Sequence, residues 1–121
     1  MRRPPDGIST PGTRAEDLAA AYLTRRGLRL VTRNFRTRHG EIDLVMRDGD
    51  TIVFVEVRLR TTPGFGGAAA SITAAKRARL VAAAEGYLAT LGREPPCRFD
   101  AVLLDGLDAA RVTWLQDVLE A

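Results

Sequence analysis

Two acidic residues, Asp43 and Glu56, lie in apolar segments on either side of the sequence Asp48-Gly49-Asp50. An Asp-Gly pair between two such segments is a strong signal for a β-hairpin, so we predict strands over Glu41–Arg47 and Thr51–Arg60. Carboxylate oxygens are the ligands that hard divalent cations prefer. The predicted hairpin is therefore the first candidate for a functional site.

The hairpin places Asp43 and Glu56 on one face in both registers that the turn allows. If Gly49-Asp50 forms the turn, Asp43 lies directly opposite Glu56, because side chains alternate between the faces of a strand. If Asp48-Gly49 forms the turn, Glu41 faces Glu56 and Asp43 is the diagonal neighbour. Like charges paired across strands destabilise a sheet by up to ~1 kcal/mol, and partial burial adds to that cost. A divalent cation such as Mg²⁺ would compensate for it.

The two faces of the hairpin differ in polarity. One is expected to be core and carries Ile42, Leu44, Met46, Val53, Val55, Val57 and Leu59. The other is charged at the end far from the turn, where it carries Glu41, Asp43, Glu56, Arg58 and Arg60. Charge pattern alone favours a solvated ladder of ion pairs, each worth roughly 0–1 kcal/mol. Against that alternative, Glu56 interrupts Val53–Val57, a run apolar enough for a strand covered on both faces.

A run of arginines precedes the hairpin without an acidic residue between them: Arg25, Arg26, Arg29, Arg33, Arg36 and Arg38. Such a run is a candidate patch for the phosphate backbone of a nucleic acid. The alternative is a solubilising face. The adjacent His39 is a candidate general base, although a lone loop histidine is more often simply solvated.

The helices and strands around these residues must position them. The spacing of apolar residues predicts a first helix that begins at Thr13 and ends at Gly27. Thr13 and Glu16 fit a capping box at its start. Its buried stripe would consist of Ala15, Leu18, Ala19, Tyr22 and Leu23. Residues 1–12 are rich in Pro, Gly, Ser and Thr and are predicted to be a flexible arm, and residues 13–121 to form a single domain.

The remaining pattern predicts the order α-β-β-β-α-β-β, a mixed sheet flanked by helices. Before the hairpin we predict an edge strand over Leu28–Asn34 and a loop over Phe35–Gly40. After a glycine-rich stretch at 61–70, a second helix is expected from Ser71 or Thr73 to Leu91, with Leu80, Ala84, Tyr87, Leu88 and Leu91 as its buried stripe. Two further strands are expected over Arg98–Leu104 and Arg111–Leu115.

Composition excludes several classes of protein. The chain has 121 residues, of which 45% are hydrophobic and 27% charged, with a net charge of +3, which fits one globular domain. With one cysteine and one histidine it can form neither an internal disulfide nor a Cys/His zinc cluster. Because neither a signal peptide nor a run of about 18 apolar residues is present, we expect a cytoplasmic protein without a membrane partner.

Together, the segments Gly40-Glu41-Ile42-Asp43-Leu44-Val45 and Val53-Phe54-Val55-Glu56-Val57-Arg58 resemble the metal-binding core of restriction-endonuclease-like nucleases. More narrowly, the chain resembles the YraN-type family of uncharacterised bacterial proteins. The likeness extends to Glu16–Ala19, Asn34–Arg36, Lys76 with Leu80, and Arg98–Val102. This resemblance implies a restriction-endonuclease-like three-layer α/β fold, with a central mixed β-sheet flanked by α-helices.

The resemblance also implies a site. Asp43 and Glu56 would hold Mg²⁺ or Mn²⁺, and Glu16 could supply a further carboxylate if it is not simply the capping residue. Arg58 stands where the nuclease motif has lysine, and arginine stays protonated, so it would serve as a fixed phosphate donor. Lys76 could substitute for the missing lysine; alternatively, its stem snorkels from the start of the second helix.

Three functions follow from these expectations. The first is a metal-dependent nuclease acting on nucleic acid, DNA ahead of RNA, with Asp43, Glu56, Arg58 and Lys76 as catalytic residues. The second is a nucleic-acid-binding protein in which arginine at position 58 marks lost catalysis. The third is a protein-interaction module. A homodimer is compatible with each.

Overall fold

The computed structural model describes residues 11–60, 73–107 and 111–119. Its elements are α1 (Pro11–Arg25), β1 (Arg29–Thr37), β2 (Gly40–Asp48), β3 (Thr51–Arg60), α2 (Ala74–Ala89), β4 (Cys97–Asp105) and β5 (Val112–Leu115). The predicted order of helices and strands is confirmed. The glycine-rich stretch at 61–70 lies outside the described residues, as do residues 1–10 of the predicted arm.

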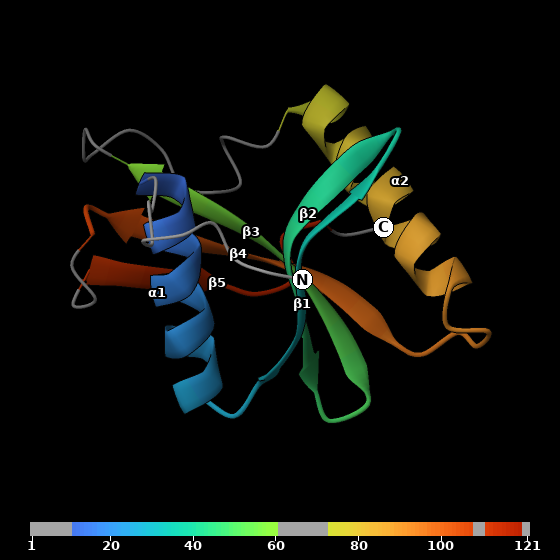
Figure 1. The fold of residues 1–121 in the computed structure, drawn as a ribbon, viewed down its shortest axis with the longest axis horizontal. Coiled ribbons are helices and arrows are strands. Elements are labelled where there is room, and N and C mark those ends of the chain that lie inside the picture. Colours follow the sequence, from blue (N-terminus) through green and yellow to red (C-terminus); the bar gives the residue numbers. More distant parts are fainter. Residues whose placement is uncertain (1–10, 61–72, 108–110, 120–121) are drawn as a thin grey trace, which may run out of the picture.

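The strands form one mixed sheet in the order β1-β2-β3-β4-β5. Neighbouring strands are antiparallel except β3 and β4, which are parallel. A parallel pair needs a long crossover, and α2 lies within that connection. Figure 1 shows α1 and α2 on opposite sides of the sheet. The result is the predicted three-layer α/β architecture, which is compatible with a restriction-endonuclease-like fold.

Each face of the sheet packs against one helix, through the stripes that helical spacing predicts. The α1 side buries Ala15, Ala19, Ala20, Leu23, Leu28, Leu44, Met46, Val53, Val55, Val102 and Leu104. The α2 side buries Ile42, Val45, Ile52, Phe54, Leu80, Ala83, Ala84 and Tyr87. β3 is therefore covered on both faces, as its apolar run indicates.

Helix α1 begins earlier than predicted. It starts at Pro11, inside the segment expected to be an arm, so Thr13 lies within the helix and the predicted capping box is wrong. Proline is favourable at the first helical position because its missing N–H would have no partner there. The predicted end is confirmed: Gly27 has φ +99, and Leu28 N–H donates to Leu23 O at 3.1 Å.

The predicted loop over Phe35–Gly40 is also wrong, because β1 runs on to Thr37 and pairs with Gly40 across a tight turn. Two contacts favour the longer strand. The Phe35 ring packs edge-on against Tyr87, with 5.3 Å between centroids. Thr37 Oγ1 donates to Gly40 O at 3.2 Å and accepts from His39 N at 3.1 Å, which closes the turn.

Of the two predicted registers of the β2–β3 hairpin, the structure has the one with the turn at Gly49-Asp50, as the pairing of Asp48 with Thr51 shows. The face predicted for Ile42 is wrong, since it packs with Leu80 on the α2 side. Alternation along β2 breaks between Ile42 and Leu44, where its ladder to β3 ends. On the other side of β2, Arg33 pairs with Leu44 and Phe35 pairs with Ile42. Asn34, which lies between these two residues of β1, has φ +53. β2 therefore turns away from β3 where the candidate site begins.

Candidate active site at the carboxylate cleft

A cleft of about 250 Å³ opens where β2 diverges from β3 and the start of α2 crosses them. It is lined by Glu41, Asp43, Glu56, Val57, Arg58, Lys76, Arg79 and Leu80, and we call it the carboxylate cleft. The predicted pair, Asp43 and Glu56, thus comes together with two other predicted residues, Arg58 and Lys76.

Asp43 is fixed by the backbone of the neighbouring strand. Its Oδ2 accepts a hydrogen bond of 2.8 Å from Val57 N–H. The backbone ladder between β2 and β3 ends at the pair of Leu44 and Val55. Beyond that pair, the Asp43 side chain supplies the acceptor that the Val57 N–H needs. The carboxylate is half-buried and has a defined orientation. Such a fixed oxygen is a suitable metal ligand or hydrogen-bond acceptor.

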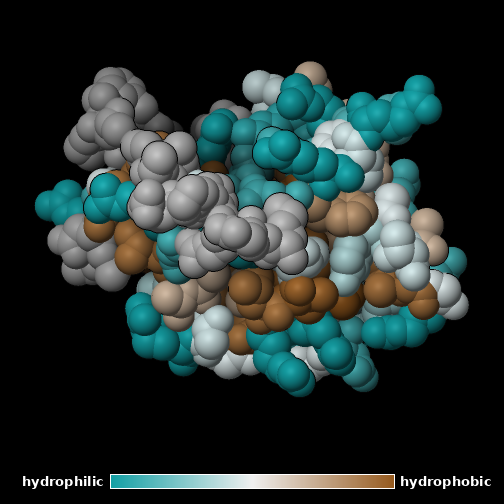
Figure 2. Space-filling view, in the orientation of Figure 1, coloured by the Kyte–Doolittle hydropathy of each residue, from teal (hydrophilic) through white to brown (hydrophobic). Residues whose placement is uncertain are grey.

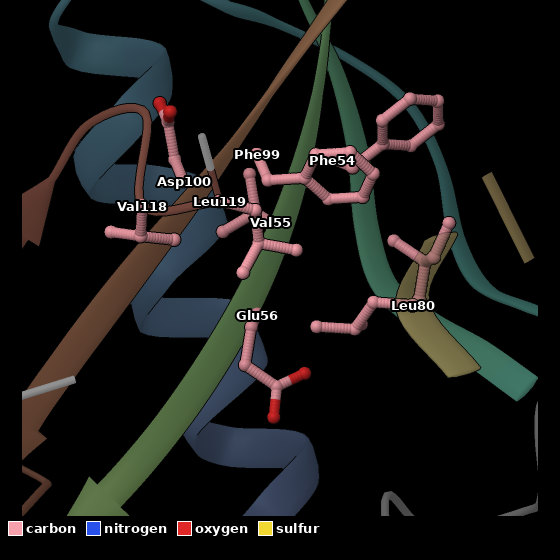
Figure 3. Close-up of a pocket in the computed structure, with 9 residues that line it drawn as sticks. Phe54, Val55, Glu56, Leu80, Phe99, Asp100, Val118 and Leu119 are labelled. Atoms are coloured by element: carbon pink, nitrogen blue, oxygen red, sulfur yellow. The ribbon is translucent and has the colours of Figure 1, made fainter. Parts of the chain in front are cut away.

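Glu56 lies in the apolar part of β3 and is only 8% exposed. Figure 3 shows its carboxylate directed away from Phe54 and Val55, its neighbours along the strand. There it forms an ion pair with Lys76 Nζ, which reaches the sheet from the first turn of α2. Thr73 begins that helix by accepting a hydrogen bond from Lys76 N–H at 3.1 Å. The cap therefore sets where the lysine leaves the helix.

The surroundings of Asp43 change its acidity. Burial, and next the negative charge of Glu56, raise the pKa of Asp43 from 3.8 to about 7. The hydrogen bond from Val57 N–H acts in the opposite direction, and the charge of Glu16 adds a smaller increase. Asp43 is therefore about half protonated near neutral pH. A cation bound at Asp43 would favour the charged form of this carboxyl.

Glu16 stands near this pair without joining it. Its Oε1 accepts from Asn34 Nδ2 at 3.1 Å, and Arg33 NH2 lies 3.5 Å away. Within the described parts of the chain, no three His, Cys, Asp or Glu side chains are placed to hold a metal ion by themselves. Two carboxylates suffice for Mg²⁺, which usually keeps several waters and also binds substrate phosphate. Asp43 and Glu56 fit such an ion, and Glu16 acts on Asp43 through its charge.

The arginine run does not form one continuous patch. Arg33 pairs with Asp17 at 2.7 Å, Arg36 pairs with Glu41 at 3.1 Å, and Arg26 stacks on the Tyr22 ring at 3.7 Å. Arg25, Arg26 and Arg29 flank the end of α1, whereas Arg36, near the end of β1, and Arg38, in the β1–β2 turn, lie next to the carboxylate cleft. The acids that neutralise Arg33 and Arg36 come from other elements, which is why the run itself does not show them.

One lining residue, Arg79, was not among the predicted site residues. It follows Lys76 by one helical turn, so both leave α2 on the same side. That spacing is the signal that could have identified it, once Thr73 is recognised as the helix cap.

A second buried carboxylate, Asp100 on β4, belongs to a separate network. Its oxygens accept from Arg98 Nε at 3.1 Å, from Trp114 Nε1 at 2.9 Å and from Asp117 N–H at 2.9 Å. Asp100 is 1% exposed. Figure 3 shows the carboxylates of Glu56 and Asp100 directed toward opposite ends of the same apolar cluster. Asp100 thus fastens the segment after β5 and is not part of the cleft.

The sequence is similar to the proteins of one family. A model described as "Uncharacterised protein family UPF0102" matches residues 15–104, which include every lining residue of the carboxylate cleft. A UPF0102 protein of Cupriavidus taiwanensis is 60% identical over 111 residues, covering 91% of this chain and 82% of that protein. Another, of Methylobacillus flagellatus, is 56% identical over 110 residues, covering 91% and 96%. A third, of Nitrosomonas europaea, is 51% identical over 109 residues, covering 90% and 92%.

Proposed function

The chain belongs to UPF0102, the family of YraN-type proteins, and from that premise we propose that it is a metal-dependent phosphodiester hydrolase acting on nucleic acid, DNA ahead of RNA. One observation carries the proposal: two carboxylates, a lysine and an arginine from three elements meet in one open cleft. The choice of DNA rests on the resemblance of the hairpin motifs to restriction-endonuclease-like nucleases.

Asp43 and Glu56 would hold Mg²⁺ or Mn²⁺. When bound, such an ion positions and activates a water and stabilises charge on the attacked phosphate. The chain contributes the orientation of its ligands, since Val57 N–H donates to Asp43 and Lys76 pairs with Glu56. The apolar wall beside Glu56 strengthens these electrostatic interactions, and the open side of the cleft admits the substrate.

Lys76 and Arg58 have different roles in this proposal. Lysine can lose its proton when its surroundings favour it, so Lys76 is the candidate to exchange a proton with the attacking water. Arg58 stays charged and would donate to a phosphate oxygen. Two residues thus share the role of the motif lysine. Arg58 supplies the positive charge at that position, and Lys76 on α2 exchanges the proton.

A second candidate function is a nucleic-acid-binding protein without catalysis. The ion pair between Lys76 and Glu56 favours it, because the ammonium already supplies a cation to the carboxylates. In this case the protein binds nucleic acid in the absence of metal, and the acids serve to hold the lysine. If the protein binds no nucleic acid, the third function, a protein-interaction module, is the one left to test.

The deciding experiment compares the wild type with Asp43→Asn, Glu56→Gln and the control Asp50→Asn. Asp50 is in the hairpin turn and its side chain is 89% exposed, so the control removes an acid from the same hairpin without touching the cleft. Single- and double-stranded DNA and RNA are incubated with Mn²⁺ or Mg²⁺, and Mn²⁺ binding is measured by calorimetry. We expect cleavage and Mn²⁺ binding in the wild type and the control, and neither in the two cleft variants.

Other results separate the candidates. If nothing is cleaved but nucleic acid binds in a salt-dependent way, and Glu56→Gln keeps that binding, the protein is the non-catalytic binder. If no nucleic acid binds at low salt, both proposals are wrong.

A further inference from the structure

A second cleft of about 470 Å³ adjoins the first, where the β1–β2 turn meets α2. It is lined by residues 36–41, which are the turn and the strand ends beside it, and by Arg79, and we call it the turn cleft. Glu41 and Arg79 line both clefts, so the two form one continuous surface. In Figure 2 hydrophilic atoms gather at the top of the view, where this turn lies beside the start of α2 in Figure 1.

The turn cleft has an excess of positive charge. Its lining includes three arginines and one acid, Glu41. Arg36 Nε pairs with Glu41 at 3.1 Å, which neutralises that acid. In the parts of the chain that the structure describes, neither Arg38 nor Arg79 makes an ion pair with an acidic side chain. Two exposed guanidinium groups are therefore left to act on an anion from outside.

The backbone holds these two arginines close together. A Cβ added at Gly40 would lie 2.2 Å from Arg79 O, so the turn rests directly on the helix backbone at this point. Thr37 Oγ1 fixes the turn from inside through its bonds to Gly40 O and His39 N. A site whose backbone is already in place loses less entropy when it binds a ligand.

We propose that the turn cleft binds a phosphate group of the nucleic-acid strand whose neighbouring phosphate lies at Asp43 and Glu56. Arg38 and Arg79 hold its oxygens, since guanidinium groups recognise phosphate through paired hydrogen bonds. The imidazole of His39 adds a donor on the turn side. This subsite rests on the proposed function, because it assumes that the occupant of the carboxylate cleft is a nucleic acid. It places the path of the strand across the two clefts.

The test measures binding and not cleavage, so that the subsite and the hydrolase can fail separately. The probe is a labelled DNA oligonucleotide, with and without a 5′-phosphate, followed by fluorescence anisotropy in EDTA over a series of salt concentrations. The double variant Arg38→Gln/Arg79→Gln is compared with the wild type. Arg93→Gln/Arg111→Gln is the matched control, because it removes the same charge at exposed positions outside both clefts.

Each phosphate contact contributes about one unit to the slope of log affinity against log salt. We expect the double variant to lower that slope by about 1, and the control to leave it unchanged. A loss on both oligonucleotides identifies an internal phosphate, and a loss confined to the 5′-phosphorylated one identifies a strand end.

Equal slopes in the double variant and the control would overturn the subsite and leave the hydrolase intact. A lowered slope in a protein that cleaves nothing would support the subsite and exclude the hydrolase. If the wild type binds neither oligonucleotide, the subsite and the proposed function are both wrong.

Discussion

Lys76 on helix α2 forms an ion pair with Glu56 on strand β3, across the cleft that the strand shares with Asp43. The pair explains how an acidic side chain that is 8% exposed is tolerated inside an apolar strand. It also means that the Lys76 ammonium and a bound metal ion would compete for the same carboxylate.

The first prediction is that Lys76→Met binds Mn²⁺ several-fold more tightly than the wild type, because the competing ammonium is gone. Cleavage should fall by about 10²-fold or more, the usual contribution of a residue that transfers a proton. Mn²⁺ calorimetry and cleavage rates are measured in parallel, with Lys76→Arg as the variant that keeps the positive charge and should keep the weaker metal binding. A weaker affinity in Lys76→Met would show that the lysine orients Glu56 for the metal.

The second prediction concerns the pH dependence of stability without metal. The pKa of Asp43 is raised from 3.8 to about 7 by burial and by the charge of Glu56, so the folded protein holds a proton that the unfolded chain has lost. This contribution to stability is complete below about pH 4 and is lost as the pH rises to 7 and above, with a slope of at most about 1.4 kcal/mol per pH unit. We expect the free energy of unfolding of the wild type to fall relative to Asp43→Asn between pH 4 and pH 8.

Urea denaturation of both proteins in EDTA at several pH values measures this difference. Taking the difference cancels the contributions of titrating groups that the substitution does not affect. The same difference measured with saturating Mn²⁺ should decrease less, because the ion stabilises the charged form of Asp43. Parallel pH profiles for the two proteins would show that Asp43 titrates alike in the folded and unfolded states.

The features of this site that depend on neighbouring residues in the sequence could be predicted, and those that depend on distant elements could not. Asp43 and Glu56 share a strong hairpin signal, and period-two alternation places them together without any knowledge of the rest of the chain. Ile42 was assigned to the wrong face because alternation assumes that β2 stays paired with β3. The last pair is Leu44 with Val55, so Asp43 is already outside the ladder, and the hairpin sequence alone does not show this.

The charges were less predictable than the backbone. No acid lies within the arginine run, yet Arg33 and Arg36 are neutralised by Asp17 and Glu41 from other elements. Such pairs depend on how α1 and β2 pack against β1. The reach of Lys76 to the sheet could be stated as a hypothesis from helical spacing, but its partner Glu56 could be identified only when the parallel crossover was in place.

The third prediction concerns the contact between the β1–β2 turn and α2. Gly40→Ala should lower the free energy of unfolding by about 2–3 kcal/mol, because the new methyl group meets the carbonyl oxygen of Arg79, and neither backbone can move freely. Gly86→Ala is the matched control on the same contact. Its Cβ would meet only the Thr37 methyl group at 3.0 Å, and alanine favours the helix by about 1 kcal/mol. We expect the control to stay within about 1 kcal/mol of the wild type in urea denaturation. Equal losses would show that the turn does not rest rigidly on α2.

The last prediction is that Asp100, unlike the other buried acid Glu56, stabilises the fold without taking part in metal binding. Asp100 accepts hydrogen bonds from Arg98, Trp114 and Asp117, so Asp100→Asn should cost about 3 kcal/mol by leaving a partly buried guanidinium without its carboxylate. Asp48→Asn removes the more exposed partner of the same arginine, at 3.3 Å, and should cost less than about 1 kcal/mol. Both variants should bind Mn²⁺ as the wild type does, because their carboxylates lie outside the carboxylate cleft. Loss of Mn²⁺ binding in a folded Asp100→Asn protein would instead place Asp100 in the metal site, and the assignment of Asp43 and Glu56 as its ligands would have to be revised.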